Sequence, residues 1–163
     1  MAFLLVGVIA VLVVADQIIK YWAVNTLMPV HTMEFIHIGD FKILDLTYLE
    51  NTGAIFGSMS GQRWFLVGFT SLVIIGGIIY MFYSAKKSKF ISTAVCLFVA
   101  GGIGNLIDRI RFGYVVDMFE IKLFNFAIFN FADICVTIAF FMMIVYALFI
   151  EPKKSKKEAE NNE

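Results

Sequence analysis

Residues 131–150 read FADICVTIAFFMMIVYALFI, and Asp133 is the only charged residue among them. A helix needs about 20 predominantly apolar residues to cross the hydrocarbon core of a bilayer. This stretch therefore predicts a membrane-spanning helix. Three further segments meet the same criterion, at about residues 2–20, 64–83 and 90–108. We expect an all-α membrane protein with four transmembrane helices.

The composition also favours a lipid environment. Hydrophobic residues make up 60% of the chain and charged residues 16%, whereas soluble domains are about half apolar and a quarter charged. The 13 basic and 13 acidic residues give no net charge, so we expect membrane lipids rather than nucleic acid as partners. The first apolar segment lacks a basic region before it and a small-residue cleavage site after it. We therefore expect it to be retained as a helix rather than removed as a signal peptide.

Basic residues predict the orientation of the chain. The connector between the second and third segments carries Lys86, Lys87 and Lys89, and four lysines follow Pro152. The positive-inside rule places these segments, together with the amino terminus, in the cytoplasm. We divide the chain into a membrane domain over residues 1–150 and a disordered cytoplasmic tail over 151–163. The connectors at about 21–63 and 109–130 then face outward, although Lys20, Arg63, Arg109 and Arg111 near the outer ends reduce the charge asymmetry.

The outer connectors carry signals for β-structure. Thr32–Ile38 and Phe41–Tyr48 partly alternate apolar and polar residues, and Gly39-Asp40 between them suits a tight hairpin turn. Residues 112–124 are rich in β-branched and aromatic types, which favour strands. We expect a small extracytoplasmic β-sheet, or cradle, on the membrane surface.

Polar residues gather at the predicted outer ends of the helices. A charged residue near the centre of a spanning helix costs about 3 kcal/mol on insertion scales, so their presence requires an explanation. The layer comprises Asp16, Gln17, Lys20, Asn105, Asp108, Arg109, Asp117, Asn130 and Asp133. Several members share a helix face, because Asp16 and Lys20 are four residues apart and Asn105 lies three before Asp108. Gly101, Gly102 and Gly104 on the third segment would let another helix approach closely.

Structural roles account for part of this layer. Asp16 and Lys20 could form an ion pair at a helix end, and Asp108 with Arg109 could anchor the outer loops. Asp133, at a helix start, could complement the helix dipole. Asp117 and Asp133 are harder to explain in this way, because Asp117 lies in an apolar run without a basic neighbour in sequence and Asp133 precedes a wholly apolar helix. Two carboxyl groups in one desolvated site share a proton, which suits the acid–base chemistry of an aspartic peptidase.

Other chemistries have weaker support. Cys96 and Cys135 show no CxxC spacing, and His31 and His37 have no metal-binding motif around them, so we expect no metal and no cofactor. Residues 57–61, GSMSG, carry Met59 where a nucleophile elbow needs serine. The third segment reads GIGN over 102–105, with asparagine where a GxGD protease has its aspartate. Two non-enzymatic alternatives stay open: a channel or transporter subunit, and an assembly scaffold.

Five motifs, in order and spread over most of the chain, resemble those of lipoprotein signal peptidase (signal peptidase II), a family of bacterial membrane peptidases. They are Asp16-Gln17-x-x-Lys20, Asn51-Thr52-Gly53-Ala54 with Phe56-Gly57, Gly101-Gly102-x-Gly104-Asn105-x-x-Asp108-Arg109, Val115-Val116-Asp117 and Phe129-Asn130-x-Ala132-Asp133. Two departures are small: Met118 replaces a common phenylalanine, and Ala127 a frequent proline. Neither removes a chemical group, so we expect them to affect the shape of the pocket rather than activity.

The resemblance implies a function and a site. Asp117 and Asp133 would be the catalytic pair. Other residues would bind substrate or support the site: Asn51, Gly53, Asn105, Arg109, Asn130, Asp108, Asp16 and Lys20. The substrate would be a prolipoprotein whose lipobox cysteine carries a diacylglyceryl group, cut just before that cysteine. The family uses no cofactor and is inhibited by the cyclic peptide globomycin. Nothing in the sequence demands more than one chain, so we expect a monomer.

Overall fold

The computed structural model describes residues 2–53, 59–85 and 88–152. Most of the predicted tail, from residue 153 onward, lies outside these ranges, and so do Lys86, Lys87 and residues 54–58, which include part of the second motif. Glu151 and Pro152, predicted to begin the disordered tail, are helical. Along the chain the elements are α1 (Ala2–Thr26), β1 (Thr32–Ile38), β2 (Phe41–Asn51), α2 (Arg63–Ser84), α3 (Lys89–Arg111), β3 (Val115–Ile121) and α4 (Phe131–Val145), which continues as a π-helix over Tyr146–Ile150.

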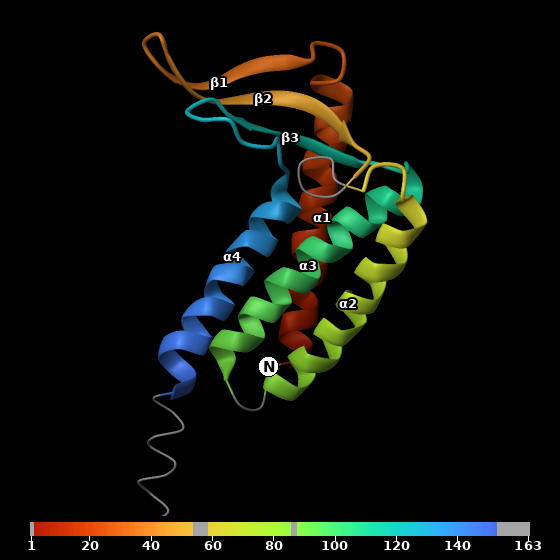
Figure 1. Cartoon of the computed structure of the whole chain (residues 1–163), viewed down its shortest axis with the longest axis vertical. Coiled ribbons are helices and arrows are strands. Elements are labelled where there is room, and N and C mark those ends of the chain that lie inside the picture. Colours follow the sequence, from red (N-terminus) through yellow and green to blue (C-terminus); the bar gives the residue numbers. More distant parts are fainter. Residues whose placement is uncertain (1, 54–58, 86–87, 153–163) are drawn as a thin grey trace, which may run out of the picture.

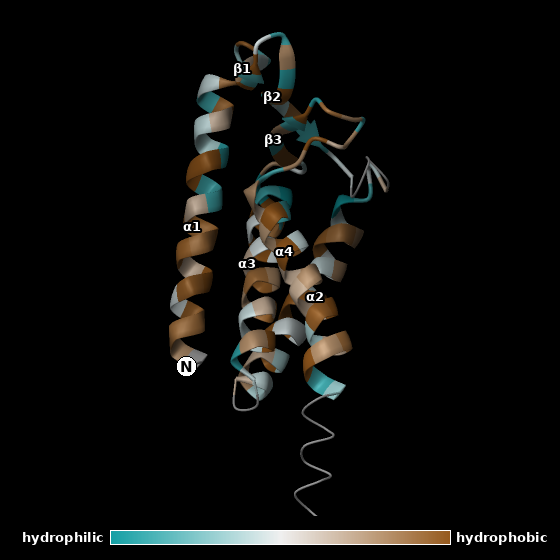
Figure 2. Ribbon diagram, turned by 90° about the vertical axis from the view of Figure 1, so that its left-hand side faces the viewer, coloured by the Kyte–Doolittle hydropathy of each residue, from teal (hydrophilic) through white to brown (hydrophobic). Residues whose placement is uncertain are grey.

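Four helices form a bundle, and a three-stranded sheet lies across one end of it (Figure 1). Within the described residues, four helices are long and apolar enough to span a membrane, and their ribbons are largely hydrophobic (Figure 2). Helix α3 is central and packs against α1, α2 and α4. The predicted fold of four transmembrane helices with a small β-sheet is confirmed.

Two helices are longer than predicted. Helix α1 continues to Thr26 rather than residue 20, and α3 continues to Arg111 rather than residue 108. The predicted end of each helix lies where charged residues lower the hydropathy of the sequence. In the structure Lys20 and Asp108 bind each other inside the bundle, so the charges do not force the helix to end. Arg109 is consequently helical and does not belong to a connector.

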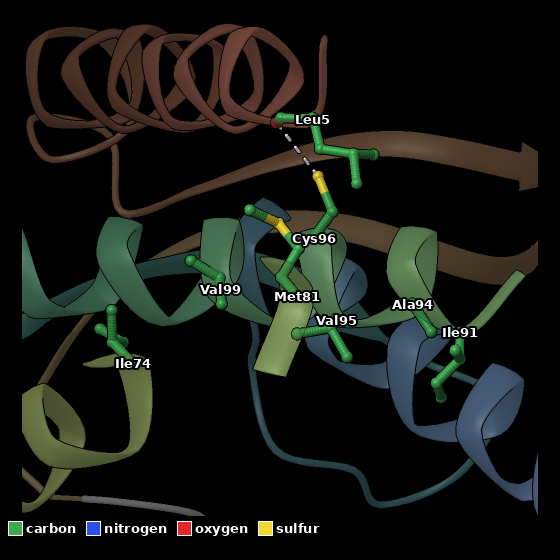
Figure 3. Packing of buried hydrophobic residues seen from close by; sticks show 8 residues of the cluster. All are labelled: Leu5, Ile74, Met81, Ile91, Ala94, Val95, Cys96 and Val99. Carbon is green, nitrogen blue, oxygen red and sulfur yellow. Dashed lines mark hydrogen bonds between the residues drawn. The ribbon is translucent and has the colours of Figure 1, made fainter. Parts of the chain in front are cut away.

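An apolar core fills the half of the bundle away from the sheet. Leu5 of α1, Ile74 and Met81 of α2, and residues of α3 around Cys96 are buried together (Figure 3). The thiol of Cys96 donates to the backbone oxygen of Leu5 at 3.4 Å. Cys96 and Cys135 are both buried and free, so they act as small core residues.

The sheet is antiparallel, in the order β1-β2-β3. Gly39 has φ +61° in the turn between β1 and β2, a backbone conformation that glycine adopts without steric cost. Strand β2 runs to Asn51, three residues beyond the predicted strand end. Leu46 of β2 and Val116 and Met118 of β3 pack against Ala23 and Leu27 at the end of α1. This second core fixes the sheet to the bundle.

Candidate active site

The predicted polar layer is confirmed as one cluster at the sheet end of the bundle. Helices α1, α3 and α4 and strand β3 all contribute to it, and most of its members are buried. The contacts cross large distances in sequence. Gln17 of α1 donates to Asp108 of α3 at 3.0 Å, and the backbone N–H of Ala132 at the start of α4 donates to Asp16 at 3.0 Å. These contacts join α1 to α3 and α4, and the N–H of Val116 in β3, which donates to Asp108 at 3.2 Å, joins the layer to the sheet.

Strand β3 positions Asp117. The residue pairs with Leu49 of β2 and its side chain is 1% exposed. Its carboxylate accepts two amide hydrogen bonds, from Nδ2 of Asn51 at 3.0 Å and from Nδ2 of Asn130 at 2.6 Å. The contact with Asn51 arises because β2 extends beyond its predicted end, which brings this side chain next to Asp117.

The first turn of α4 positions Asp133. Asn130 is the N-cap, and the two residues form a capping box: the Asp133 N–H donates to Oδ1 of Asn130 at 3.0 Å, and the Asn130 N–H donates to Oδ2 of Asp133 at 3.1 Å. Asp133 therefore caps its helix, and it lies in the first turn, where the structural alternative expected it to complement the helix dipole. Its Oδ1 also accepts from Nδ2 of Asn105 at 2.8 Å, so capping is only one of its contacts.

Three asparagines direct their NH₂ groups at the two acids, and each is held in that orientation. Oδ1 of Asn51 accepts from the N–H of Gly53 at 3.0 Å. Oδ1 of Asn130 is held by the capping box, and its Nδ2 also donates to Oδ1 of Asn105 at 3.0 Å. Lys20 donates to that same Asn105 oxygen at 2.9 Å. An amide whose oxygen accepts a hydrogen bond must offer its NH₂ on the other side, so the site is lined with donors to the carboxylates.

The protonation of Asp117 is shifted toward neutral pH. Burial, and then the nearby carboxyl of Asp133, raise the pKa of Asp117 from 3.8 to about 7, against the lowering effect of its amide donors and of Lys20. Arg109 also faces this carboxyl. A buried carboxyl whose pKa is raised by a second carboxyl beside it can hold a proton that the two groups share.

Arg109 lies beside the two acids and contacts the residues that follow β2. Its Nη2 donates to the backbone oxygen of Gly53 at 2.9 Å, and the N–H of Gly53 donates to the side chain of Asn51. The Nε of Arg109 is buried and has no hydrogen-bond partner among the residues the structure describes. Arg63, which was not predicted to support the site, donates from its side chain to the backbone oxygens of Arg109 and Ile110 at 2.8 and 2.7 Å. The only signal in the sequence was a cation at the start of an apolar helix.

A cavity of about 530 Å³ opens at the two acids. Its lining combines the polar site with apolar side chains of β3, of α4 and of the segment between them. These residues are Asn51, Asn105, Arg109, Val115, Asp117, Ile121, Phe126, Ala127, Ile128, Phe129, Asp133, Ile134, Val136, Thr137 and Ile138. Ala127, a predicted departure in sequence, is part of this lining, whereas Met118 is fully buried in the core beneath the sheet. In the described part of the chain, no cluster of three or more His, Cys, Asp or Glu side chains could hold a metal.

Gly104 makes room for the polar layer, which gives a testable prediction. A Cβ at this position would lie 2.5 Å from Oδ2 of Asp16. We expect Gly104→Ala to displace Asp16 and lower the melting temperature of the purified protein in detergent. Gly76→Ala is the matched control, because a Cβ there meets nothing within 4 Å and alanine favours a helix by about 1 kcal/mol over glycine. Equal melting temperatures for the two variants would contradict this packing.

The sequence matches the family described as Signal peptidase (SPase) II over residues 8–149. The chain belongs to this family. Lipoprotein signal peptidase of Lactococcus lactis subsp. cremoris is 36% identical over 146 residues, which cover 86% of this chain and 91% of that protein. The Clostridioides difficile lipoprotein signal peptidase is 34% identical, covering 90% and 95%.

Solved structures support the fold of this signal peptidase II family member. A bacterial membrane enzyme determined by the in meso method at 2.3 Å superposes with a TM-score of 0.74 and 31% identity, covering 90% of this chain and 87% of that one. A second bacterial membrane enzyme, at 1.9 Å, gives 0.69 and 30% identity, covering 91% and 93%. The chain is thus a multi-pass membrane protein with the fold of these enzymes.

Proposed function

We propose that this chain is an aspartyl endopeptidase that removes signal peptides from diacylglyceryl-modified prolipoproteins, cutting just before the lipidated cysteine. Family membership supports the removal of signal peptides. The observation that carries the chemistry is the pairing of Asp117 and Asp133 in one cavity, where Asn130 donates to the first from its side chain and to the second from its backbone. Among the described residues that line this cavity, Asp117 and Asp133 are the only acids.

The proposed reaction uses one proton shared by the pair. The ionised carboxylate takes a proton from water as the water oxygen attacks the scissile carbonyl, and the protonated carboxyl donates to the carbonyl oxygen. The resulting tetrahedral intermediate carries two hydroxyl groups and collapses when its C–N bond breaks. The carboxyl that took the proton from water donates it to the departing cysteine nitrogen, and the other carboxylate takes back a proton from one hydroxyl group as the C=O bond of the new carboxyl terminus forms. The pair ends with one proton, as it began. A pKa of about 7 for Asp117 suits this exchange near neutral pH.

The apolar side chains that line the cavity suit a substrate that stays in the bilayer. Each buried methylene of a lipid chain contributes about 0.8 kcal/mol to membrane binding, so a diacylglyceryl group holds the scissile bond at the membrane interface. The cavity continues from Asp133 along Ile134 and Ile138 of α4, a helix that spans the membrane. We place the sheet and the site at the outer face of the cytoplasmic membrane and both termini inside.

A channel or transporter pathway has less support. The polar layer occupies one end of the bundle, and the other half is closed by the apolar cluster around Met81, Val99 and Cys96, which are all almost fully buried. A polar pathway across the bilayer would have to pass through this cluster. The geometry therefore favours chemistry at one membrane face.

The proposal is tested by giving the purified full chain two matched precursors in detergent–lipid micelles. One carries the diacylglyceryl group on its lipobox cysteine and the other is the unmodified peptide. We expect mass spectrometry to show a single cut in the lipidated precursor, just before the cysteine, and a much slower reaction of the unmodified one. Equal cleavage of both, or no cleavage of the lipidated precursor, would overturn the proposal.

The raised pKa of Asp117 predicts the pH dependence of the reaction. The pair needs its shared proton, so kcat should fall as the pH rises through about 7. Asn51 donates to Asp117 and lowers the pKa of that carboxyl, so Asn51→Ala should move the alkaline limb to higher pH. The folded chain also binds this proton more tightly than the unfolded chain, for which the value is 3.8. Its contribution to stability is therefore present at acid pH and lost as the pH rises through about 7. A limb that moves to lower pH in the variant would contradict the assignment.

A further inference from the structure

Three buried charged side chains lie behind the proposed catalytic pair. Asp16 and Asp108 are each 1% exposed and Lys20 is 3% exposed. Nζ of Lys20 lies 3.0 Å from Oδ2 of Asp16 and 2.9 Å from Oδ2 of Asp108. Gln17 adds a second link, because its Nε2 donates to both acids, at 3.3 and 3.0 Å. A buried ion pair brings little net stability compared with apolar residues of the same volume, so stability alone does not explain this cluster.

Each acid of the cluster also holds the backbone next to one of the catalytic residues. Oδ1 of Asp16 accepts the N–H of Ala132 at 3.0 Å, and Ala132 immediately precedes the catalytic aspartate of α4. Oδ2 of Asp108 accepts the N–H of Val116 at 3.2 Å, and Val116 immediately precedes the catalytic aspartate of β3. In both contacts, an acid of the cluster accepts the N–H of the residue just before an aspartate of the pair. Lys20 joins the two acids that make them.

We propose that Asp16, Lys20 and Asp108 form a positioning clamp that sets the distance between the carboxyl groups of Asp117 and Asp133. Asp16 fixes the start of α4, Asp108 fixes β3, and the ammonium group of Lys20 holds the two arms together. None of the three is a catalytic residue in this scheme, because each acts through the backbone or through another side chain. The inference rests on the proposed function, since it assumes that the pair is catalytic.

The third donor of Lys20 acts on the same geometry. A lysine ammonium has three N–H donors and no acceptor. Two of them face the acids of the clamp, and the third donates to Oδ1 of Asn105 at 2.9 Å. Nδ2 of Asn105 then donates to Oδ1 of Asp133 at 2.8 Å. The clamp thus reaches Asp133 twice, at the backbone just before it and at its carboxylate.

The separation of the two carboxyls matters for the rate. Both must reach one attacking water and one scissile bond, and a misplacement of about 1 Å in a catalytic group can cost about a hundredfold in rate. The acids come from a strand and from a helix that are separate elements of the fold. A rigid link between those elements is therefore needed, and the clamp supplies it.

Two substitutions at one position separate this role from ion pairing. Asp16→Asn and Asp16→Leu both remove the negative charge, so both lose the ion pair with Lys20. Only the asparagine keeps a side-chain oxygen that can accept the N–H of Ala132. We expect kcat of Asp16→Leu to be at least about tenfold below that of Asp16→Asn, with KM for the lipidated precursor within about twofold. Both are measured at equal concentrations of folded protein.

The pH dependence of kcat is a second measurement, and it should not change if Asp16 only stabilises the fold. The two variants carry the same charge, so any difference between their profiles reports geometry. If the carboxyl groups of Asp117 and Asp133 move apart, Asp133 raises the pKa of Asp117 less. The alkaline limb of Asp16→Leu should therefore lie at lower pH than that of Asp16→Asn. Ser84→Ala is the stability control. It removes the buried Ser84–Ser92 hydrogen bond between the end of α2 and the start of α3, at the end of the bundle away from the sheet. We expect it to lower the melting temperature and leave the limb in place.

The outcomes separate the clamp from the proposed function. Equal kcat and coincident limbs for Asp16→Asn and Asp16→Leu, with wild-type cleavage intact, would overturn the clamp alone. A wild-type chain that does not cut the lipidated precursor would overturn the proposed function. If Asp16→Leu does not fold, Asp108→Asn and Asp108→Leu decide by the same comparison through Val116, with the same expected order of kcat.

Discussion

Asp117→Asn and Asp133→Asn are each expected to lower kcat for the lipidated precursor by about a thousandfold or more. General acid–base groups contribute about 10² to 10⁴ to a rate, and here each acid serves in both steps of the reaction. Asparagine has nearly the same size as aspartate but can neither take up nor release the proton. The measurement is single-turnover cleavage by the purified variant, with the product identified by mass spectrometry.

Both variants should remain folded, which separates lost chemistry from lost structure. Burial of Asp117 favours its neutral form, so Asp117→Asn should melt at the wild-type temperature or above it at alkaline pH. Asp40→Asn is the matched control, because Asp40 is exposed in the turn between β1 and β2. We expect it to cleave at the wild-type rate. Full activity in either dyad variant would exclude the aspartyl mechanism.

Lys20→Met is expected to be the most destabilising single substitution among the polar residues of the bundle. It leaves Asp16 and Asp108 buried and facing each other without the cation that lies within 3.0 Å of both. Removing one partner of a buried ion pair costs about 3–5 kcal/mol. The free energy of unfolding can be measured by denaturant titration in mixed micelles.

An exposed ion pair provides the comparison. Lys122 lies 2.8 Å from Glu120 on the sheet, but its side chain is 32% exposed. Surface ion pairs contribute about 0–1 kcal/mol, so Lys122→Met should change stability by less than about 1 kcal/mol. A similar loss in the two lysine variants would show that the Lys20 cluster is not a buried ionic network.

Much of the fold follows from local patterns in the sequence. The four apolar stretches predict the helices, because few soluble arrangements tolerate 20 such residues in a row. Gly39-Asp40 predicts the hairpin, since glycine takes the positive φ that the turn requires. The spacing of Asp16 and Lys20 predicts their ion pair, which the structure shows at 3.0 Å. Each of these features is determined by residues that are close together in the sequence.

The contacts that make the site depend on segments far apart and could not be predicted. The N–H of Ala132 reaches Asp16 across 116 positions, and Asn51 reaches Asp117 across 66. The true end of α1 depends on such a contact too, because Asp108 on another helix neutralises Lys20 and lets the helix continue. The positions of the polar residues at the ends of the apolar segments predict that these residues share a membrane depth. Only the packed structure shows that three asparagines turn their NH₂ groups toward the acids.

The proton shared by Asp117 and Asp133 can be measured directly by difference infrared spectroscopy of the purified protein. The carbonyl stretch of a protonated carboxyl group is followed while the pH is raised through neutrality. We expect a band that disappears with a pKa of about 7 in the wild-type chain and is missing in Asp117→Asn. A band that titrates unchanged in that variant, or a wild-type chain with no carboxyl titrating near neutral pH, would contradict the account.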